Sequence, residues 1–191
     1  STAFHVCRTV VLSSLIISCT APGARVQPAG QILLSGDSIG PVPSGVTRLA
    51  LSRFATIARD TVEEGLEAIP ESVTVVVVAG DTLRVAVDGG RAYRLSVSSP
   101  RFRTTDSLGP GIPLARLLRE PGLFALTGEG AVYVQSPRHC GLSFHLSESG
   151  ALADSPDSVG AAALRTLPAR TTVDAVSAFG CRRARSSAPP G

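Results

Sequence analysis

The sequence predicts an α+β fold made of two tandem repeats, each a glycine-containing turn and a short helix packed on a three-stranded antiparallel sheet. The first observation is an internal duplication: DSIGP at Asp37–Pro41 returns as DSLGP at Asp106–Pro110, and each copy is followed by a glycine and an apolar pattern of helical spacing. The second observation is a change of period, because apolar residues alternate after Val73. These observations divide the body into a first repeat at 31–99 and a second at 100–181.

Residues 1–19 have the composition of an export signal. A single positive residue, Arg8, precedes the apolar run Val10–Ile17, which is too short to span a bilayer. The run ends in IISC, and this motif, with Cys19 at its last position, resembles the lipobox of bacterial lipoproteins. The resemblance implies a lipoprotein signal peptide, a lipid anchor on Cys19, and a place in the bacterial cell envelope at the outer membrane, facing the periplasm. Ordinary secretion and a buried helix of a cytosolic protein remain alternatives.

The chain after the anchor is predicted to be a flexible tether at 20–30, because it carries Pro, Gly and small residues without periodicity. The first repeat then opens with a short edge strand at Gln31–Leu34. Val46 to Ile57 has apolar residues at helical spacing, which predicts a first helix. Thr61 and Glu64 have the spacing of a capping box, which predicts a second short helix from Thr61 to Ile69.

Three antiparallel strands complete the first repeat. Their β-branched and alternating apolar residues place them at Val73–Val78, Thr82–Val87 and Tyr93–Val97. The turn between the last two strands sets Val85 opposite Leu95 and Val87 opposite Tyr93.

The second repeat is predicted to contain one clear helix, which starts at Pro113 and stops at Pro121 and Gly122. Three strands follow in a segment that also holds one helical turn, and the last ten residues lack any apolar pattern. The predicted elements are strands at Ala131–Gln135, Leu142–Leu146 and Val173–Phe179, a helical turn at Ala161–Arg165, and a disordered tail at 182–191.

Export makes a disulfide between Cys140 and Cys181 an expected feature. If the strand after Cys140 runs antiparallel to the last strand, with Leu142 opposite Phe179 and Phe144 opposite Ser177, the same register sets the two cysteines opposite each other. Two free, buried thiols remain the alternative, because sequence alone cannot bring the two Cα atoms together.

The composition argues against several classes of function. The net charge is +3, and the basic residues, all arginines, are spread along the chain, which does not indicate nucleic-acid binding. His139, Cys140 and His145 lie within seven residues, but in a strand both histidines would point away from Cys140 onto a solvent-exposed face, so no metal site is predicted. We find no catalytic set and no cofactor loop. Arg101 and Arg103 are also assigned to an exposed strand face.

The two duplicated turns are the candidate binding sites, because a carboxylate, a hydroxyl and free amides could hold a small anion or a partner's peptide. A purely structural role, in which the turns fix the bend between strand and helix, is the stronger interpretation. The residues are Asp37, Ser38, Gly40, Asp106, Ser107 and Gly109.

The turn motifs, the LARLL helix and the strands resemble the β-lactamase-inhibitor-protein-like fold and the small outer-membrane lipoproteins of the SmpA/OmlA (BamE) type. This resemblance implies a non-enzymatic module without cofactors that binds or assembles another envelope component, most simply an envelope protein. Two alternatives remain. One is an envelope hydrolase with His139 or His145 near a carboxylate such as Glu129, and the other is an inhibitor of a secreted enzyme.

Overall fold

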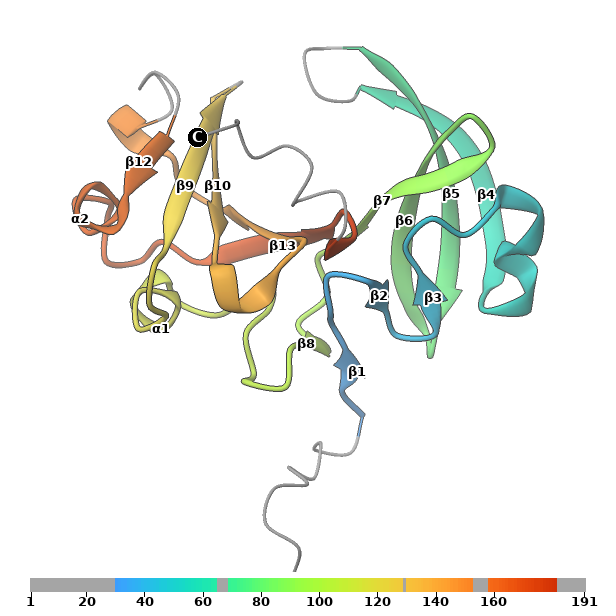
Figure 1. Ribbon diagram of the computed structural model, residues 1–191, viewed down its shortest axis with the longest axis horizontal. Coiled ribbons are helices and arrows are strands. Elements are labelled where there is room, and N and C mark those ends of the chain that lie inside the picture. Colours follow the sequence, from blue (N-terminus) through green and yellow to red (C-terminus); the bar gives the residue numbers. More distant parts are fainter. Residues whose placement is uncertain (1–29, 65–68, 129, 153–157, 182–191) are drawn as a thin grey trace, which may run out of the picture.

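One nine-stranded antiparallel sheet runs through the whole molecule in the computed structural model, which describes residues 30–64, 69–128, 130–152 and 158–181 (Figure 1). In spatial order its strands are β12 (Ser158–Gly160), β9 (Phe124–Gly128), β10 (Ala131–Gln135), β11 (Leu142–Leu146), β13 (Val173–Ala178), β7 (Arg91–Val97), β6 (Asp81–Asp88), β5 (Pro70–Val78) and β4 (Thr56–Glu64). The predicted fold class is therefore wrong, because the protein is mainly β.

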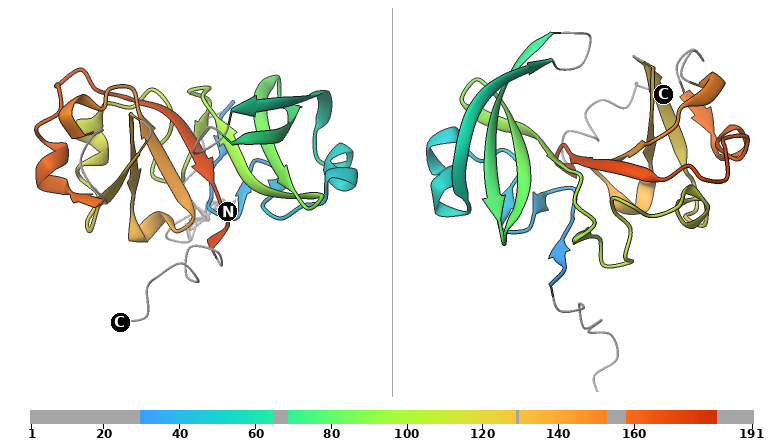
Figure 2. Two further views of the ribbon diagram at one scale, coloured as in Figure 1. Left: turned by 90° about the horizontal axis from the view of Figure 1, so that it is seen from above. Right: turned by 180° about the vertical axis from the view of Figure 1, so that it is seen from behind.

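The two predicted repeats do not keep separate sheets, because β13 pairs with both β11 and β7. Figure 2 shows this last strand, in red, bridging the two halves when the molecule is seen from behind. Without β13, one side of β7 would present unpaired backbone amides and carbonyls, which an edge strand leaves open. The pairing satisfies these groups and joins 31–99 to 100–181 in one sheet.

The remaining elements are short. They are β1 (Ile32–Leu33), which pairs in parallel with β8 (Phe102–Arg103); the β2–β3 hairpin (Ser38–Ile39 and Val42–Pro43); the helices α1 (Leu114–Leu117) and α2 (Ala161–Leu164); and the 3-10 helices η1 (Arg48–Arg53), η3 (Pro137–His139) and η4 (Gly150–Leu152).

The second predicted helix, Thr61–Ile69, is wrong, because its first half is the end of β4. This strand pairs with β5 from Thr56 to Glu64, and the pairing supplies backbone hydrogen bonds along nine residues. It also places Asp60 and Glu63 beside arginine partners, Arg48 and Arg84. Asp60 and Glu63 of β4 therefore each have a cationic partner on another element.

The first predicted helix is reduced to the six residues of η1. The backbone carbonyl of Val46 accepts a hydrogen bond from Ala92 N, and Arg48 N donates to Gly90 O, so the start of the expected helix is bound to the turn between β6 and β7 instead. Only Leu51 of η1 is fully buried, and it anchors this helix to the core.

Most predicted strands are confirmed, but two registers differ. Val85 does pair with Leu95, whereas Val87 pairs with Ala92 because a bulge follows Ala86. Phe144 pairs with Val176, one residue away from the predicted Ser177. Paired residues share a face, and this register places two fully buried apolar side chains together instead of facing Phe144 with a serine.

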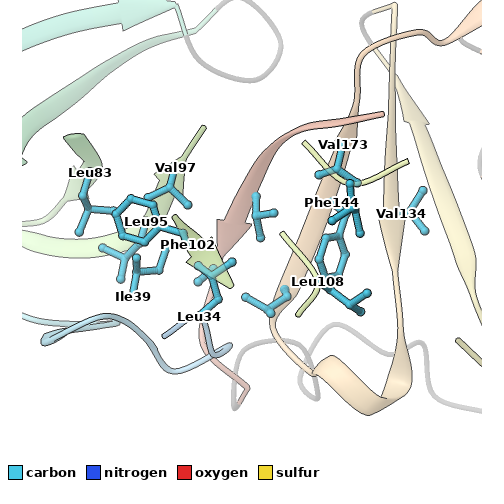
Figure 3. Close-up of a cluster of buried hydrophobic side chains, with 14 of the residues drawn as sticks. Leu34, Ile39, Leu83, Leu95, Val97, Phe102, Leu108, Val134, Phe144 and Val173 are labelled. Carbon is cyan, nitrogen blue, oxygen red and sulfur yellow. The ribbon is translucent and has the colours of Figure 1, made fainter. Parts of the chain in front are cut away.

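One large hydrophobic core extends under both halves of the sheet (Figure 3), and a second, small cluster is formed by Val73, Val75 and Ala86. Leu83, Leu95 and Ile39 lie at one end, Phe144 and Val134 at the other. The segment between β7 and α1 crosses from one half to the other and contributes Phe102 and Leu108, both fully buried. The core therefore continues across the junction of the predicted repeats.

Candidate functional site

The first predicted turn, Asp37–Gly40, lies at the β2–β3 hairpin. Ser38 N donates a hydrogen bond to Ser35 Oγ at 3.0 Å, and Gly40 forms the tip between the two strands. The carboxylate of Asp37 accepts a hydrogen bond from Cys181 N at 2.9 Å. The hydrogen bonds of Asp37 and Ser38 therefore hold this turn together and attach it to the C-terminal end of the described chain.

The second predicted turn, Asp106–Gly109, is closed by its own hydrogen bonds. Leu108 N donates to Thr104 Oγ1 at 3.0 Å, and Ser107 adopts a φ of 63°. A Cβ on Gly109 would lie 2.2 Å from the backbone oxygen of Phe102, so only glycine fits at this position. The side chain of Asp106 extends toward η3.

The first turn contacts the disulfide between Cys140 and Cys181, whose Cα atoms are 5.1 Å apart. The predicted disulfide is confirmed, and the alternative of two free thiols is excluded. Asp37 contacts Cys181 directly, whereas Asp106 approaches His139, the residue before Cys140. The duplicated motifs, which are 69 positions apart in the sequence, thus each contact one of the two segments that the disulfide joins.

His139 is not on an exposed strand face as predicted. It ends η3, its side chain is 10% exposed, and its ring lies edge-on to Phe144. Its buried Nε2 forms no hydrogen bond with the described residues and lies 3.7 Å from Glu120 Oε2 and 3.8 Å from Asp106 Oδ2. Arg138 also contacts Glu120, at 3.3 Å, so two cationic or potentially cationic groups face the same carboxylates.

His145 lies on β11 and makes a separate pair. Its Nδ1 is 2.7 Å from Asp174 Oδ1, and its ring stacks on Tyr133. Neither histidine hydrogen-bonds a serine or cysteine in the described part of the chain, which a nucleophile and base would require. Within the same residues there is also no group of three or more His, Cys, Asp or Glu side chains arranged to hold a metal ion. Glu129, named for the hydrolase alternative, lies outside the described residues.

An open groove of about 800 Å³, hereafter the entry groove, lies beside the point where the described chain begins. It is bounded by β1, the β2–β3 turn, the end of η1, and the paired ends of β4 and β5; the lining residues are Gln31, Ile32, Leu33, Gly40, Pro41, Ser52, Phe54, Ala55, Thr56, Ile57, Val77, Val78 and Ala79. Two large apolar side chains, Leu33 and Phe54, line it while remaining 39% and 36% exposed.

Arg101 fixes one end of the entry groove. Its Nε donates to Gly30 O at 3.0 Å, its Nη1 donates to Ala79 O at 2.9 Å, and the same nitrogen pairs with Asp81 at 2.6 Å. The neighbouring Arg103 donates to Pro110 O, and burial lowers the pKa of its guanidinium. Arg101 is exposed as predicted, whereas Arg103 is half-buried, and the two side chains hold the start of β1 and the second turn in place.

The sequence carried little signal for the entry groove, since its walls come from five segments between Gln31 and Ala79. Gly40 is the one predicted site residue that lines it. Cys19 lies outside the described residues, as do the signal peptide, the tether before Gly30 and the tail at 182–191. Among the described residues, no helix is long and apolar enough to cross a membrane.

The fold and the groove define a mainly β protein with one open antiparallel sheet, a disulfide, and a shallow, partly apolar surface groove. No family model and no curated protein matches this sequence. A solved structure, that of the uncharacterized protein YfeY from Escherichia coli, is similar with a TM-score of 0.55 at 14% identity, and the match covers 77% of this chain and 99% of that chain. At this identity the likeness shows a shared fold alone.

Proposed function

We propose that the protein is a lipid-anchored module of the bacterial cell envelope, and that it binds another envelope component in the entry groove. The observation that carries this proposal is the exposure of Leu33 and Phe54 in a groove of about 800 Å³. Grooves lined by apolar side chains with a few polar groups, here Gln31 and Ser52, are the usual form of binding sites. Covering the two side chains would remove apolar surface from water, which favours binding.

Two further observations support the envelope setting. The lipobox-like sequence ending at Cys19 would attach the chain to a membrane, and disulfides such as Cys140–Cys181 persist in oxidising compartments outside the cytosol. The groove adjoins Gly30, so the component it binds would meet the body at the anchored end. No comparable observation favours catalysis, since His139 and His145 contact carboxylates but no nucleophile among the described residues.

Site-specific photo-cross-linking tests the proposal. A photoreactive phenylalanine analogue replaces Leu33 in the full-length protein in its native envelope, and the matched control carries the analogue at Phe124, which is 38% exposed on β9 in the other half. We expect one defined adduct, a protein or a lipid identified by its mass, from position 33 and none of it from position 124. Equal, diffuse labelling at both positions would count against a binding groove.

The anchor is tested separately by Cys19→Ala, which removes the acceptor of the lipid. We expect the variant in the soluble fraction after a high-salt wash, because salt screens an electrostatic contact between the body and the bilayer but does not release a covalent lipid anchor. A variant that stays with the membrane after its signal peptide is removed and after the salt wash would contradict the anchor.

A further inference from the structure

We infer that the entry groove and the adjoining face of η1 form a contact surface for anionic membrane lipid, so that the body rests on the bilayer that anchors it. This inference rests on the proposed function, because it names the envelope component that the groove binds. Three observations support it: the chain enters the body beside the groove, large apolar side chains are exposed there, and the exposed cation Arg53 adjoins them.

The place of chain entry brings the groove to the membrane. Gly30 is held by Arg101, and the three residues that follow it line the groove. Residues 20–29 separate Gly30 from Cys19, and ten residues reach at most roughly 35 Å when fully extended. In Figure 1 the chain enters at β1, at the bottom of the view, on the side of the molecule away from the hairpin between β4 and β5. A lipid on Cys19 therefore keeps the groove within a short distance of the headgroups.

Three of the exposed large apolar side chains in the described part of the chain lie on or beside this groove. Leu33 and Phe54 line the groove, and Leu49 of η1 is 91% exposed. Residues three apart on a 3-10 helix lie on the same face, so Leu49 shares its face with Ser52, which also lines the groove. A leucine exposed to this degree contributes nothing to the core, whereas at a bilayer interface its side chain can enter the acyl boundary.

A cation adjoins this apolar surface. Arg53 is the last residue of η1, lies in the sequence between the lining residues Ser52 and Phe54, is exposed, and forms no ion pair with any described residue. An exposed arginine among leucine and phenylalanine is the composition of segments that lie in the interface of anionic membranes, where each nearby basic residue contributes about 1 kcal/mol. The charge selects lipids with an anionic headgroup over a neutral apolar ligand.

The chain contains no tryptophan, so a single introduced tryptophan reports on one position. Phe54→Trp places the reporter on the entry groove, and Phe124→Trp places it at a site of nearly equal exposure on β9. Both full-length, lipidated proteins are reconstituted in vesicles of phosphatidylglycerol and phosphatidylcholine with brominated acyl chains, which quench indole fluorescence by contact. Circular dichroism of both variants confirms that each has kept its fold.

We expect the tryptophan at position 54 to be blue-shifted and quenched at least severalfold more strongly than the tryptophan at position 124. Arg53→Glu in the Phe54→Trp background should lower the quenching in anionic vesicles to the level seen in vesicles of phosphatidylcholine alone. The matched control, Arg119→Glu, changes another exposed arginine that also forms no ion pair with the described residues, and it should leave the quenching unchanged.

Equal quenching at positions 54 and 124, or none at position 54, would overturn the inference, and an Arg53→Glu variant indistinguishable from its parent would overturn the choice of anionic lipid. The cross-linking test keeps the two proposals apart. A defined protein adduct at position 33, together with an unquenched tryptophan at position 54, would leave the proposed function standing and refute the lipid surface. Failure of both tests would refute both.

Discussion

At the scale of single residues, charged side chains hold segments together that are distant in the sequence. Asp37 binds the backbone of Cys181, Arg101 binds Gly30 and Ala79, and Asp60 links η1 to β5. Each link joins one charged side chain to backbone or to a partner on another element. Charge-assisted hydrogen bonds of this kind are stronger than neutral ones. Changing one residue should therefore loosen a defined junction.

Asp60 makes the stability of the folded state depend on pH in the acidic range. The pKa of its carboxyl is held below the ordinary value, first by the hydrogen bonds from Arg48 and then by the one from the Thr74 hydroxyl. A lowered folded-state pKa means that this group stabilises the fold above its unfolded pKa, near 3.9, and that the contribution is lost as the pH falls through the folded value. We expect Asp60→Asn to lower the thermal midpoint at neutral pH and to make no difference in strong acid.

The matched control for this pH series is Asp88→Asn, because Asp88 is exposed and forms no ion pair in the described part of the chain. Its midpoint should follow that of the unmodified protein at every pH. A constant difference between Asp60→Asn and the unmodified protein down to strong acid would show that the carboxylate charge is not the cause.

Gly109 permits the close approach of the second turn to β8. Since an added Cβ would lie 2.2 Å from Phe102 O, Gly109→Ala must move backbone, and we expect a loss of about 1–3 kcal/mol in the free energy of unfolding. Chemical denaturation measures it. Gly128→Ala, where an added Cβ meets nothing within 4 Å, is the control and should not destabilise the protein. Similar losses in both variants would refute the steric argument.

At the scale of elements, the end of β13 is attached to the start of β11 by hydrogen bonds and by a covalent bond. Phe179 N donates to Gly141 O, and the disulfide joins Cys140, one residue before Gly141, to Cys181, two residues after Phe179. The bridge also holds the first turn, through Asp37, and therefore stabilises three segments at once. The bridge thus joins the start of β11, the end of β13 and the first turn at a point where the strand ends would otherwise separate.

Removal of this bridge should be costly. It closes a loop with a sequence separation of 41, for which the chain-entropy model gives about 4 kcal/mol. We expect reductant, or Cys140→Ser combined with Cys181→Ser, to lower the free energy of unfolding by up to that amount in denaturant titrations. Reductant should have no effect on the double variant. An unmodified protein whose midpoint does not respond to reductant would contradict the stabilising role.

At the scale of the whole molecule, the two halves share one sheet and one core. β13 pairs with β7 through Val176–Val97, Ser177–Ser96 and Ala178–Leu95, and the hydroxyls of Ser96 and Ser177 lie 2.8 Å apart. On the opposite face of the sheet, Val97 and Val176 are buried in the core. Neither half could unfold without exposing this junction.

We therefore expect one cooperative unfolding transition, not two. The reporters Phe54→Trp and Phe124→Trp lie in different halves, so their fluorescence follows each half separately during denaturation. The two curves should have coincident midpoints and slopes, and both should coincide with the loss of circular dichroism. Separate midpoints would mean that the halves are independent units despite their shared sheet.

Local sequence patterns predicted the secondary structure correctly where an element depends only on neighbouring residues. The strands β10 and β11 have the predicted bounds, and β5, β6 and β7 differ only at their ends, because β-branched and alternating apolar residues define a half-buried strand by themselves. β4 was missed because TIARDTVEE lacks an apolar alternation, and its capping-box spacing favours a helix. Its pairing with β5 outweighs that local preference. The disulfide could be predicted, although the register on which it was based is shifted by one residue.

The sequence by itself determined the positions of most strands, the cysteine pair and the two turns, since these depend on period, composition and short motifs. Only the tertiary structure decided that β13 pairs with the open edge of β7. It also decided that His139 packs against Glu120 and Asp106, and that Leu33 and Phe54 border one groove. These three features arise from contacts between segments far apart in the chain. The hydrophobic effect has no direction, so many arrangements of the same strands could bury the apolar faces, and the pairing of backbone hydrogen bonds at the open strand edges selects among them.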